Sequence, residues 1–409
     1  MTPHQRKTAA IVSNLLHWFP SNSRDLPWRT TRDPYAIWVS EIMLQQTQVK
    51  TVIPYWERWM HELPNIQSLA KAPPQKIHKL WEGLGYYTRV RNMQKAALLV
   101  MKEHRGAFPS RFQQVLELPG IGRYTAGAIC SIAFNQPTPI LDGNVIRVLT
   151  RLFGIAKNPR EKKTNDKLWE IAGQLVKEAS LLQPQISVSH DGDLNPNSPE
   201  TPATIHSCAC SNSCSLLNQS LMELGALLCT PKSPRCDLCP LAPHCTALQK
   251  NKVHQFPRPA PRPRATHRYF AAFIVERNGH FLVRQRPPHV VNAHLWEFPN
   301  IELETEQSAL NGAAEKELGA KRLSLQPFCT IHHSITRYRI CLQAFAVIAK
   351  TSSRLKGQWL KPSQLNLLPF SSAHKKILRQ LLHPSTRLNK PNRRRTHHTE
   401  LPKHCFIQG

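Results

Sequence analysis

The sequence contains no hydrophobic run that approaches the roughly 18 residues of a membrane-spanning helix. Its first residues, MTPHQRKTAAIVSNLLHWF, hold only a short apolar patch that Asn14 and His17 interrupt. This pattern is typical of an amphipathic helix and lacks the core of a signal peptide. We therefore expect a cytoplasmic protein, in which the eleven cysteines serve as metal ligands or free thiols rather than as disulfide partners.

Acidic residues are scarce. The 409-residue chain has 26 Asp and Glu against 54 Lys and Arg, which gives a formal net charge of +28 and an isoelectric point near 10.1. Such an excess favours a polyanionic partner, because phosphate contacts supply most of the non-specific affinity for nucleic acids. The length allows two or three domains.

The densest group of motifs runs from Leu118 to Arg151. It begins with a tight turn in which Gly120 and Gly122 allow positive φ angles and leave backbone N–H groups bare. An apolar helix expected over Tyr124–Phe134 follows at once, so its positive N-terminal end faces the turn. A nucleic-acid phosphate fits there, and an ordinary turn between helices with glycine as C-cap is the alternative.

Asp142 opens a second helix in the same stretch. As an N-cap it would accept a hydrogen bond from the backbone N–H of Asn144 or Val145. We expect the helix start to keep this carboxylate ionised, which suits it to stabilise a developing cation as well as to cap the helix.

A second carboxylate lies on the apolar face of an earlier helix, which Asp33–Pro34 begins as cap and first turn. Glu41 stands four residues after Ile37 and three before Leu44, on one helical face. A buried, unpaired carboxyl group has a raised pKa, as a general acid at neutral pH requires. The alternative is a helix rolled so that Glu41 meets solvent or an arginine.

The same helix ends in two amides and a hydroxyl: Gln45, Gln46 and Thr47. Short polar side chains in series suit hydrogen bonding to base edges or a wedge into a duplex. A solvated helix end is the alternative.

A glycine-rich loop follows at residues 81–87. We expect its tip to present Leu84 and Tyr86, because an aromatic side chain on such a loop can stack between bases. An aromatic that closes the turn against the core is the alternative. Arg89 and Arg91 come next and are predicted to contact phosphates.

Four closely spaced cysteines form a loop later in the chain: Cys229, Cys236, Cys239 and Cys245. Four thiolates so arranged can ligate tetrahedral zinc or a [4Fe–4S] cluster, and spacing alone does not decide between them. Before this loop, residues 183–213 are rich in Ser, Pro, Asn and Thr, so we predict a disordered insert. Three more cysteines at its end are predicted to be free thiols, and a metal site is the alternative: Cys208, Cys210 and Cys214.

The second half of the chain has a different pattern. Residues 251–268 form a Pro/Arg-rich linker. An alternating segment then turns at Asn278–Gly279, a hairpin signal, and a helix near 309–318 precedes further strands at 330–349. This order predicts an α+β domain over 269–384, followed by a basic, disordered tail at 385–409.

These motifs resemble a known family. LPGIGRYTAGA followed by LDGNVIRV, together with SEIMLQQTQV and the cysteine loop, is similar to the helix-hairpin-helix base-excision DNA glycosylases. At Tyr124 the endonuclease III branch has a lysine that forms a Schiff base, which tyrosine cannot do. The resemblance therefore points to the MutY branch of monofunctional adenine glycosylases, and it covers residues 10–182 and 214–380.

The resemblance implies a mainly α glycosylase domain over 1–250 with a [4Fe–4S] cluster. In it Glu41 would protonate adenine N7, Asp142 would stabilise the oxocarbenium ion, and Tyr124 would assist at the pocket edge. Five further positions match residues around the adenine: Arg24, Trp28, Arg29, Leu44 and Gln219. For Trp28, a core anchor of its loop is the alternative. The residue matching Tyr86 is the one inserted into the duplex.

The α+β domain resembles the Nudix-like domain of the same family. Residues 312–319 match a Nudix helix but lack its acidic REUxEE core, so metal ligands for pyrophosphate hydrolysis are missing. Family members carry a Phe-Ser-His loop that checks for 8-oxoguanine, and Ile335–Arg337 aligns with it. Thr336 keeps the hydroxyl, whereas the Phe and the His are lost.

The resemblance thus implies a monomeric, nucleoid-associated enzyme of base excision repair. It would bind double-stranded DNA and hydrolyse the N-glycosidic bond of adenine mispaired with 8-oxoguanine or guanine. A thymine-mismatch or endonuclease III-like glycosylase and a non-catalytic DNA-binding protein are the alternatives. Tyr124 argues against the endonuclease III-like enzyme, and the second domain argues against both glycosylase alternatives. The pair of Glu41 and Asp142 argues against a non-catalytic protein.

Overall fold

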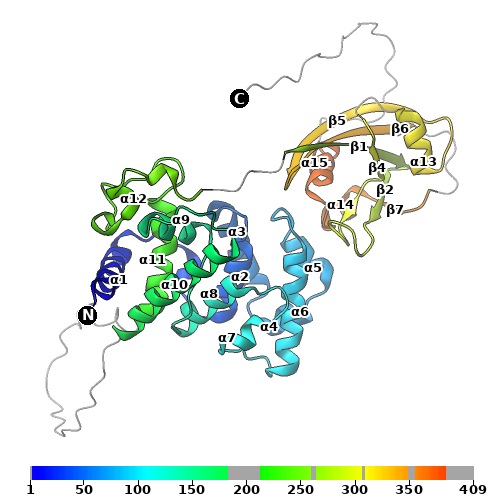
Figure 1. Cartoon of the computed structure of the whole chain (residues 1–409). Coiled ribbons are helices and arrows are strands. Elements are labelled where there is room, and N and C mark those ends of the chain that lie inside the picture. The colour runs from blue at the N-terminus through cyan, green and yellow to red at the C-terminus, as the bar shows by residue number, and fades with distance from the viewer. Residues whose placement is uncertain (1, 183–211, 259–263, 306–308, 349–354, 384–409) are drawn as a thin grey trace. The chain divides into compact units, whose positions relative to one another are not determined.

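The computed structural model describes residues 2–182, 212–258, 264–305, 309–348 and 355–383. The chain divides into two compact units, residues 1–263 and 264–409 (Figure 1). The first is helical and the second is built on a β-sheet, so the prediction of a mainly α domain followed by an α+β domain is confirmed. No helix in the described ranges is both long and apolar enough to cross a membrane.

Helices joined by short turns make up the first unit. The α-helices before the insert are α1 (Pro3–Asn22), α2 (Pro34–Leu44), α3 (Val49–Glu62), α4 (Ile66–Lys71), α5 (Pro74–Leu80), α6 (Thr88–Glu103), α7 (Phe112–Leu116), α8 (Arg123–Phe134), α9 (Gly143–Leu152) and α10 (Lys162–Leu181). After it come α11 (Ser213–Leu227) and α12 (Thr246–Gln249), and the described 3-10 turns are η1 (Pro27–Arg29), η4 (Ala242–His244) and η5 (Val253–Gln255).

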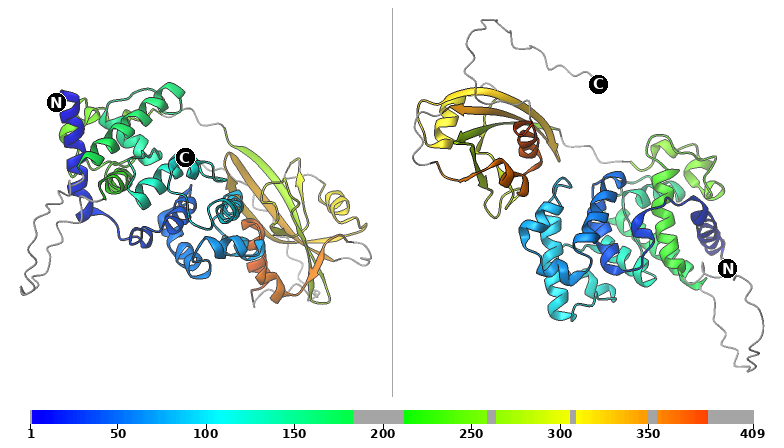
Figure 2. Two further views of the ribbon diagram at one scale, coloured as in Figure 1. Left: turned by 90° about the horizontal axis from the view of Figure 1, so that it is seen from below. Right: turned by 180° about the vertical axis from the view of Figure 1, so that it is seen from behind.

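One hydrophobic core of this unit lies among α1, α8, α9, α10 and α11. Helix α11 runs against both α8 and α9 (Figure 2). Gly225 permits this approach, because a Cβ added there would lie 2.7 Å from Cβ of Asn144 at the start of α9. The packing fixes the start of α9, where Asp142 is the N-cap, against the C-terminal part of α11.

The insert predicted over 183–213 is shorter at its C-terminal end. Ser213 already begins α11, while residues 183–211, with Cys208 and Cys210, lie outside the described residues. Cys214 therefore belongs to a helix and not to the insert. It is fully buried, with its thiol 3.8 Å from the carbonyl oxygen of Val176.

The linker predicted over 251–268 is also shorter. At its start Val253 and Phe256 are buried beside Ala247, because these apolar side chains find a small core next to α12. Their carbonyl oxygens each accept a hydrogen bond from Nε of Arg151 at 3.0 Å. At its end, the first strand of the second unit already begins at Thr266. The tail predicted over 385–409 lies outside the described residues.

The second unit is a mixed sheet with helices on both faces (Figures 1 and 2). Its strands are β1 (Thr266–Arg277), β2 (His280–Gln285), β3 (Trp296–Glu297), β4 (Asn300–Leu303), β5 (Ser324–Ile335), β6 (Tyr338–Ile348) and β7 (Gln358–Leu360). Its helices are α13 (Leu310–Leu318), α14 (Pro362–Leu367) and α15 (Ser372–Leu381).

The strand order is β3-β2-β1-β6-β5, with β4 also paired to β1 and β7 to β2. Strands β1 and β6 run parallel, and the other pairs are antiparallel. Alternate residues of β1 point to opposite faces: Phe273 packs towards α13 and Ile274 towards α14 and α15. The predicted hairpin turn is confirmed, since Asn278 and Gly279 have φ angles of 50° and 73°.

Candidate active site

One cavity of the first unit brings together residues from distant parts of the sequence. Its volume is about 540 Å³, and η1, α2, the starts of α8 and α9, and α11 surround it. The size is that of a small-molecule site. All residues predicted for catalysis and for the base pocket line it, together with the turn after α2: Glu41, Tyr124, Asp142, Arg24, Trp28, Arg29, Leu44, Gln219, Gln45, Gln46 and Thr47.

Glu41 projects from α2, whose residues from Tyr35 to Met43 are all buried. It is only 5% exposed, so the predicted position on an apolar face is confirmed. Burial raises the pKa of Glu41 to about 7; the O–H of Tyr124 and the charge of Arg29 oppose this rise, and the charge of Asp142 adds to it. A carboxyl group with such a pKa can deliver a proton at neutral pH.

Tyr124 lies in the first turn of α8 and contacts Glu41 directly. Its hydroxyl donates to Oε2 of Glu41 at 2.8 Å, and Sδ of Met222 lies 3.4 Å away on the other side. Burial and the neighbouring carboxylates raise the pKa of Tyr124, so the phenol keeps its proton. This residue can therefore donate a hydrogen bond into the site, and it cannot form a Schiff base.

Asp142 is the N-cap of α9, as predicted. Its Oδ1 accepts from the backbone N–H of Val145 at 2.7 Å, and its Oδ2 accepts from the side-chain amide of Asn144 at 3.0 Å. Burial raises the pKa of Asp142, and these hydrogen bonds and the charge of Arg147 offset part of that rise. The carboxylate sits in a low-dielectric wall, where its charge acts strongly on a nearby cation.

Glu223 of α11 was missed by the sequence analysis. It is 1% exposed and accepts hydrogen bonds from both Arg24 and Arg29, with closest distances of 2.7 Å and 2.8 Å. Burial alone would raise the pKa of Glu223, but the two arginines hold it at about 2. This ionised cluster joins the loop around η1 to α11. The signal in the sequence was the one charged residue in an otherwise uncharged helix.

Trp28 was predicted to line the base pocket or to anchor its loop to the core, and its position fits both interpretations. It lines the cavity and is 7% exposed, and its ring meets that of Trp56 edge-on with centroids 6.1 Å apart. The core anchor of the loop is thus also a wall of the site.

The turn after α2 and the loop at 81–87 border a second cavity of about 290 Å³, lined in part by Gln46, Tyr86 and Gly120. Gln46 and Tyr86 both have positive φ angles, 57° and 47°. Tyr86 is 45% exposed, whereas Leu84 is only 6% exposed. The prediction that the tip presents Leu84 is therefore wrong, because Leu84 turns into the core of the unit; the tip presents Tyr86.

Arg89 does not lie on the surface as a phosphate ligand would. Its guanidinium donates to the carbonyls of Ile42, Met43 and Gln45 and to those of Leu84 and Gly85, with a shortest distance of 2.6 Å. Burial lowers the pKa of Arg89 to about 10. The prediction for this arginine is wrong. It ties the end of α2 to the loop that presents Tyr86, because its guanidinium donates to carbonyl groups of both segments.

The glycine turn before α8 uses its two glycines differently. Gly120 has a φ of +81°, and a Cβ there would lie 2.6 Å from Cβ of Asn92. Gly122 is the N-cap of α8 with a φ of −97°, which any residue adopts. Of the two glycines, which both allow a positive φ, only Gly120 adopts one. Gly122 exposes the first N–H groups of α8 without a capping side chain.

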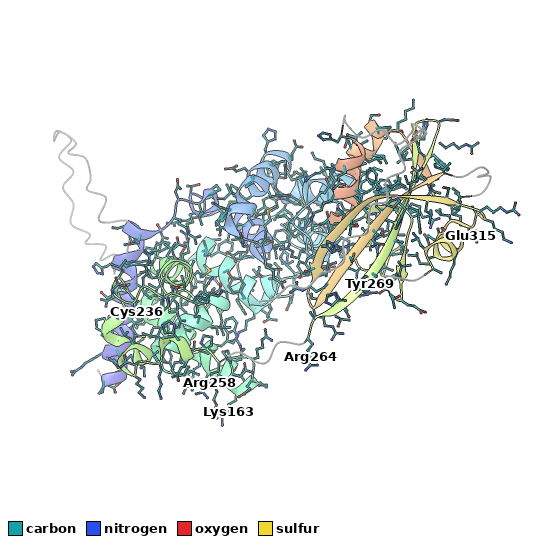
Figure 3. The ribbon with its side chains drawn as sticks, turned by 90° about the horizontal axis from the view of Figure 1, so that it is seen from above. Lys163, Cys236, Arg258, Arg264, Tyr269 and Glu315 are labelled. Carbon is teal, nitrogen blue, oxygen red and sulfur yellow. The ribbon has the colours of Figure 1, made fainter. Side chains whose placement is uncertain are left out.

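The four predicted metal-binding cysteines lie close to one another between α11 and α12, and Figure 3 labels Cys236 in this loop. Burial, with contributions from the neighbouring thiols, raises the pKa of Cys236 and of Cys239, the latter to about 11. Crowded thiolates therefore need cations among them. In the described ranges, no group of three or more His, Cys, Asp or Glu converges as the ligands of a single ion would.

Thr336 lies in the second unit, at the turn between β5 and β6. It is exposed, has a φ of +51°, and its hydroxyl donates to the carbonyl of Ile335 at 2.7 Å. The neighbouring guanidinium of Arg337 lies over the ring of Tyr338, 5.2 Å from its centroid.

The acidic residues of α13, the helix that resembles a Nudix helix, have partners within the second unit. Glu317 is paired with Arg284, and Glu315 accepts from the backbone N–H of Arg322.

Family models match three parts of the chain. They describe a HhH-GPD superfamily base excision DNA repair protein at residues 39–174, the iron–sulfur binding domain of endonuclease III at 229–245, and a NUDIX domain at 270–380. The second match spans the four cysteines from first to last. The predicted [4Fe–4S] cofactor is thereby confirmed, and the zinc alternative is set aside.

Curated relatives align with most of the chain. The adenine DNA glycosylase of Mus musculus is 34% identical and that of Homo sapiens 31%; the alignments cover 90% and 91% of this chain and 77% and 74% of those proteins. The adenine DNA glycosylase of Buchnera aphidicola is 34% identical over 76% of this chain and 79% of its own length. The chain, with its Glu41–Tyr124 pair, capping Asp142 and four-cysteine loop, belongs to the adenine DNA glycosylase family.

Proposed function

We propose that this protein removes adenine mispaired with 8-oxoguanine or guanine from double-stranded DNA, acting as a monomer at the nucleoid in base excision repair. The observation that carries the proposal is the arrangement of Glu41, Tyr124 and Asp142 around one cavity. It supplies a carboxyl group with a pKa of about 7, a phenol bonded to it and a fixed second carboxylate. A non-catalytic DNA-binding protein has no need of such a set.

The chemistry divides between the two carboxyl groups. The adenine leaves the base stack and enters the cavity. Glu41 gives its proton to N7 of the base, so the bond between C1′ and N9 breaks with its electron pair on the base. Asp142 faces the oxocarbenium ion that remains on the sugar, and water adds to C1′ with loss of a proton. The oxygen of the product sugar comes from water.

The reaction stops at base release. A lyase reaction would require an amine that attacks C1′, and no lysine is among the described residues that line the cavity. Tyr124 stands where the lyase branch has its lysine, so the endonuclease III-like alternative lacks its nucleophile.

We assign the choice of base to the walls of this cavity. Arg24 and Arg29 are held by Glu223, so the wall beside Trp28 presents ionised groups in fixed positions. Fixed, buried polar groups reject a base that leaves them unpaired, which is the strongest form of discrimination. Trp28, Leu44 and Gln219 complete this wall.

We assign DNA binding to the surface beside the cavity. The turn after α2 carries Gln45, Gln46 and Thr47, and the neighbouring loop carries the exposed Tyr86. Arg89 holds these two segments together. Side chains on such fixed turns can enter the space that an extruded base leaves. The bare N–H groups at Gly120–Gly122 and the start of α8 suit a phosphate.

The second unit would read the base opposite the adenine. A β-branched residue with a positive φ is strained, and such strain is concentrated at functional sites. Thr336 is such a residue, and it is exposed at the tip of a hairpin. Its hydroxyl can donate and accept at the altered edge of 8-oxoguanine, and the guanidinium of Arg337 beside it suits a phosphate.

A base-release assay across mismatches tests the proposal. Duplexes with A opposite 8-oxoguanine, A opposite G, T opposite G and A opposite T are incubated with the protein, and alkali then cleaves abasic sites. We expect cleavage of the first two only, without cleavage when alkali is omitted. Release of thymine would favour the thymine-mismatch alternative, and binding without any release would favour the non-catalytic one.

A further inference from the structure

The hydroxyl of Tyr124 has two possible acceptors. Oε2 of Glu41 lies 2.8 Å away and Sδ of Met222 lies 3.4 Å away. A phenol has one hydrogen, so it donates to one acceptor at a time. Met222 comes from α11, is partly buried, and lines the cavity with Glu41 and Tyr124.

The balance between the two acceptors depends on the proton of Glu41. An ionised carboxylate is a strong acceptor, so the phenol then donates to Glu41. When Glu41 carries the proton, its oxygen becomes a neutral acceptor and the advantage over the thioether shrinks. The sulfur is a weak acceptor in both states. The sulfur of Met222 can therefore compete for the Tyr124 O–H only while Glu41 is protonated, and in doing so it stabilises protonated Glu41.

We propose that Met222 is a positioning residue for the acid proton of Glu41: its sulfur accepts the Tyr124 O–H while Glu41 is protonated and releases it when Glu41 gives the proton away. This inference rests on the proposed role of Glu41 as general acid. The proton passes from Glu41 to N7 of adenine. The Tyr124 hydroxyl only rotates about its C–O bond towards the new carboxylate, whose charge it stabilises.

The other groups that face Glu41 do not alternate in this way. Asp142 comes from α9 and is fixed as an N-cap, and Arg29 comes from η1 and is bound to Glu223 of α11. Their charges act on Glu41 in both protonation states. Asp142 and Arg29 therefore affect the pKa of Glu41 equally in the wild type and in a variant that lacks the Met222 sulfur.

The test is the pH dependence of Met222→Leu, which removes the acceptor and keeps most of the volume. Single-turnover release of adenine opposite 8-oxoguanine is measured at saturating enzyme across neutral pH. In this variant the protonated form of Glu41 loses the sulfur that accepts the Tyr124 O–H, so the pKa of Glu41 should fall. The pH at which the rate declines should therefore move down by about half a pH unit. On the alkaline side this shift corresponds to a rate about threefold lower, since one pKa unit is a factor of ten. The rate at low pH should match that of the wild type. Met93→Leu, in the buried face of α6, is the matched control and should shift nothing.

A second background separates hydrogen bonding from packing. In Tyr124→Phe the phenolic hydroxyl is gone, so adding Met222→Leu should leave the pH profile of that background unchanged. Met222→Gln, whose amide oxygen accepts, should return the fall in rate to the wild-type pH or above. The inference is overturned if Met222→Leu matches the wild type, or if its shift persists in the background that lacks the hydroxyl. A wild-type protein that releases no adenine would instead refute the proposed function.

Discussion

Asn144 holds the carboxylate of Asp142 from one side, with its side-chain amide 3.0 Å from Oδ2. The oxygen of the same amide accepts from Arg147 at 2.8 Å, and Arg147 in turn donates to the carbonyl of Cys229 at 2.7 Å. One chain of contacts therefore leads from the cluster loop to the carboxylate in the cavity. Asn144 and the backbone N–H of Val145 together hold the two oxygens of Asp142.

Asn144→Ala should slow adenine release about tenfold, because a hydrogen bond to a charged group contributes about 1.5–3 kcal/mol and only part of it acts on the transition state. Single-turnover rates measure the effect, and DNA affinity should stay within about twofold of the wild type. The control is Asn165→Ala, whose amide bonds a carbonyl of a surface loop. Equal rates for wild type and Asn144→Ala would mean that Asp142 is fixed by its backbone contact alone.

Glu41→Gln and Asp142→Asn should each abolish adenine release, with losses of about a thousandfold or more, while DNA binding survives. For the wild type the rate should fall as pH rises through about 7, the pKa of Glu41, because the acid must be protonated to act. Glu57→Gln, on an exposed part of α3, serves as control. A variant of either carboxylate with near wild-type turnover would remove that residue from the mechanism.

Much of this site could be predicted from the sequence, because its strongest signals are local. The cap at Asp142 and the position of Glu41 on α2 follow from spacing within single helices. Glu223 could not be found in this way, since its partner Arg24 lies 199 positions away. The same limit explains Arg89 and Leu84, whose burial depends on where two loops meet. The sequence also does not reveal which of Gly120 and Gly122 adopts a positive φ.

Glu223→Gln should destabilise the first unit by about 3 kcal/mol, because it leaves buried arginine charge without its partner. Arg29 is the more affected, with a side chain 15% exposed. Urea denaturation measures the loss. Asp166→Asn breaks an exposed ion pair with Lys162, where both side chains are more than half exposed, and should cost less than about 0.5 kcal/mol. Equal losses for the two variants would contradict a structural role for the buried cluster.

Cys229→Ser should remove iron from the protein and lower its thermal stability, because the metal-bound loop joins α11 to α12. Purified wild-type protein should be brown and contain about four irons per chain. Iron and sulfide analysis of the purified variants measures the effect. Cys329→Ser, at a partly buried cysteine of the second unit, should keep the full iron content. A wild-type protein with stoichiometric zinc and no iron would contradict the assignment.

Thr336→Gly separates the function of this residue from its structural cost. Glycine adopts the φ of +51° found here without the strain of a β-branched side chain, so the folded state should gain about 1 kcal/mol. The same change deletes the hydroxyl that we assign to the lesion. We therefore expect a higher melting temperature. We also expect the ratio of the rates for A opposite 8-oxoguanine and A opposite G to fall at least about fivefold, because one polar contact to the lesion is lost. Thr330→Ala, at an exposed threonine of the same strand, should change neither quantity. If Thr336→Gly stabilises the protein and slows both substrates equally or not at all, the hydroxyl does not read the lesion, and the second unit contributes to binding through other residues.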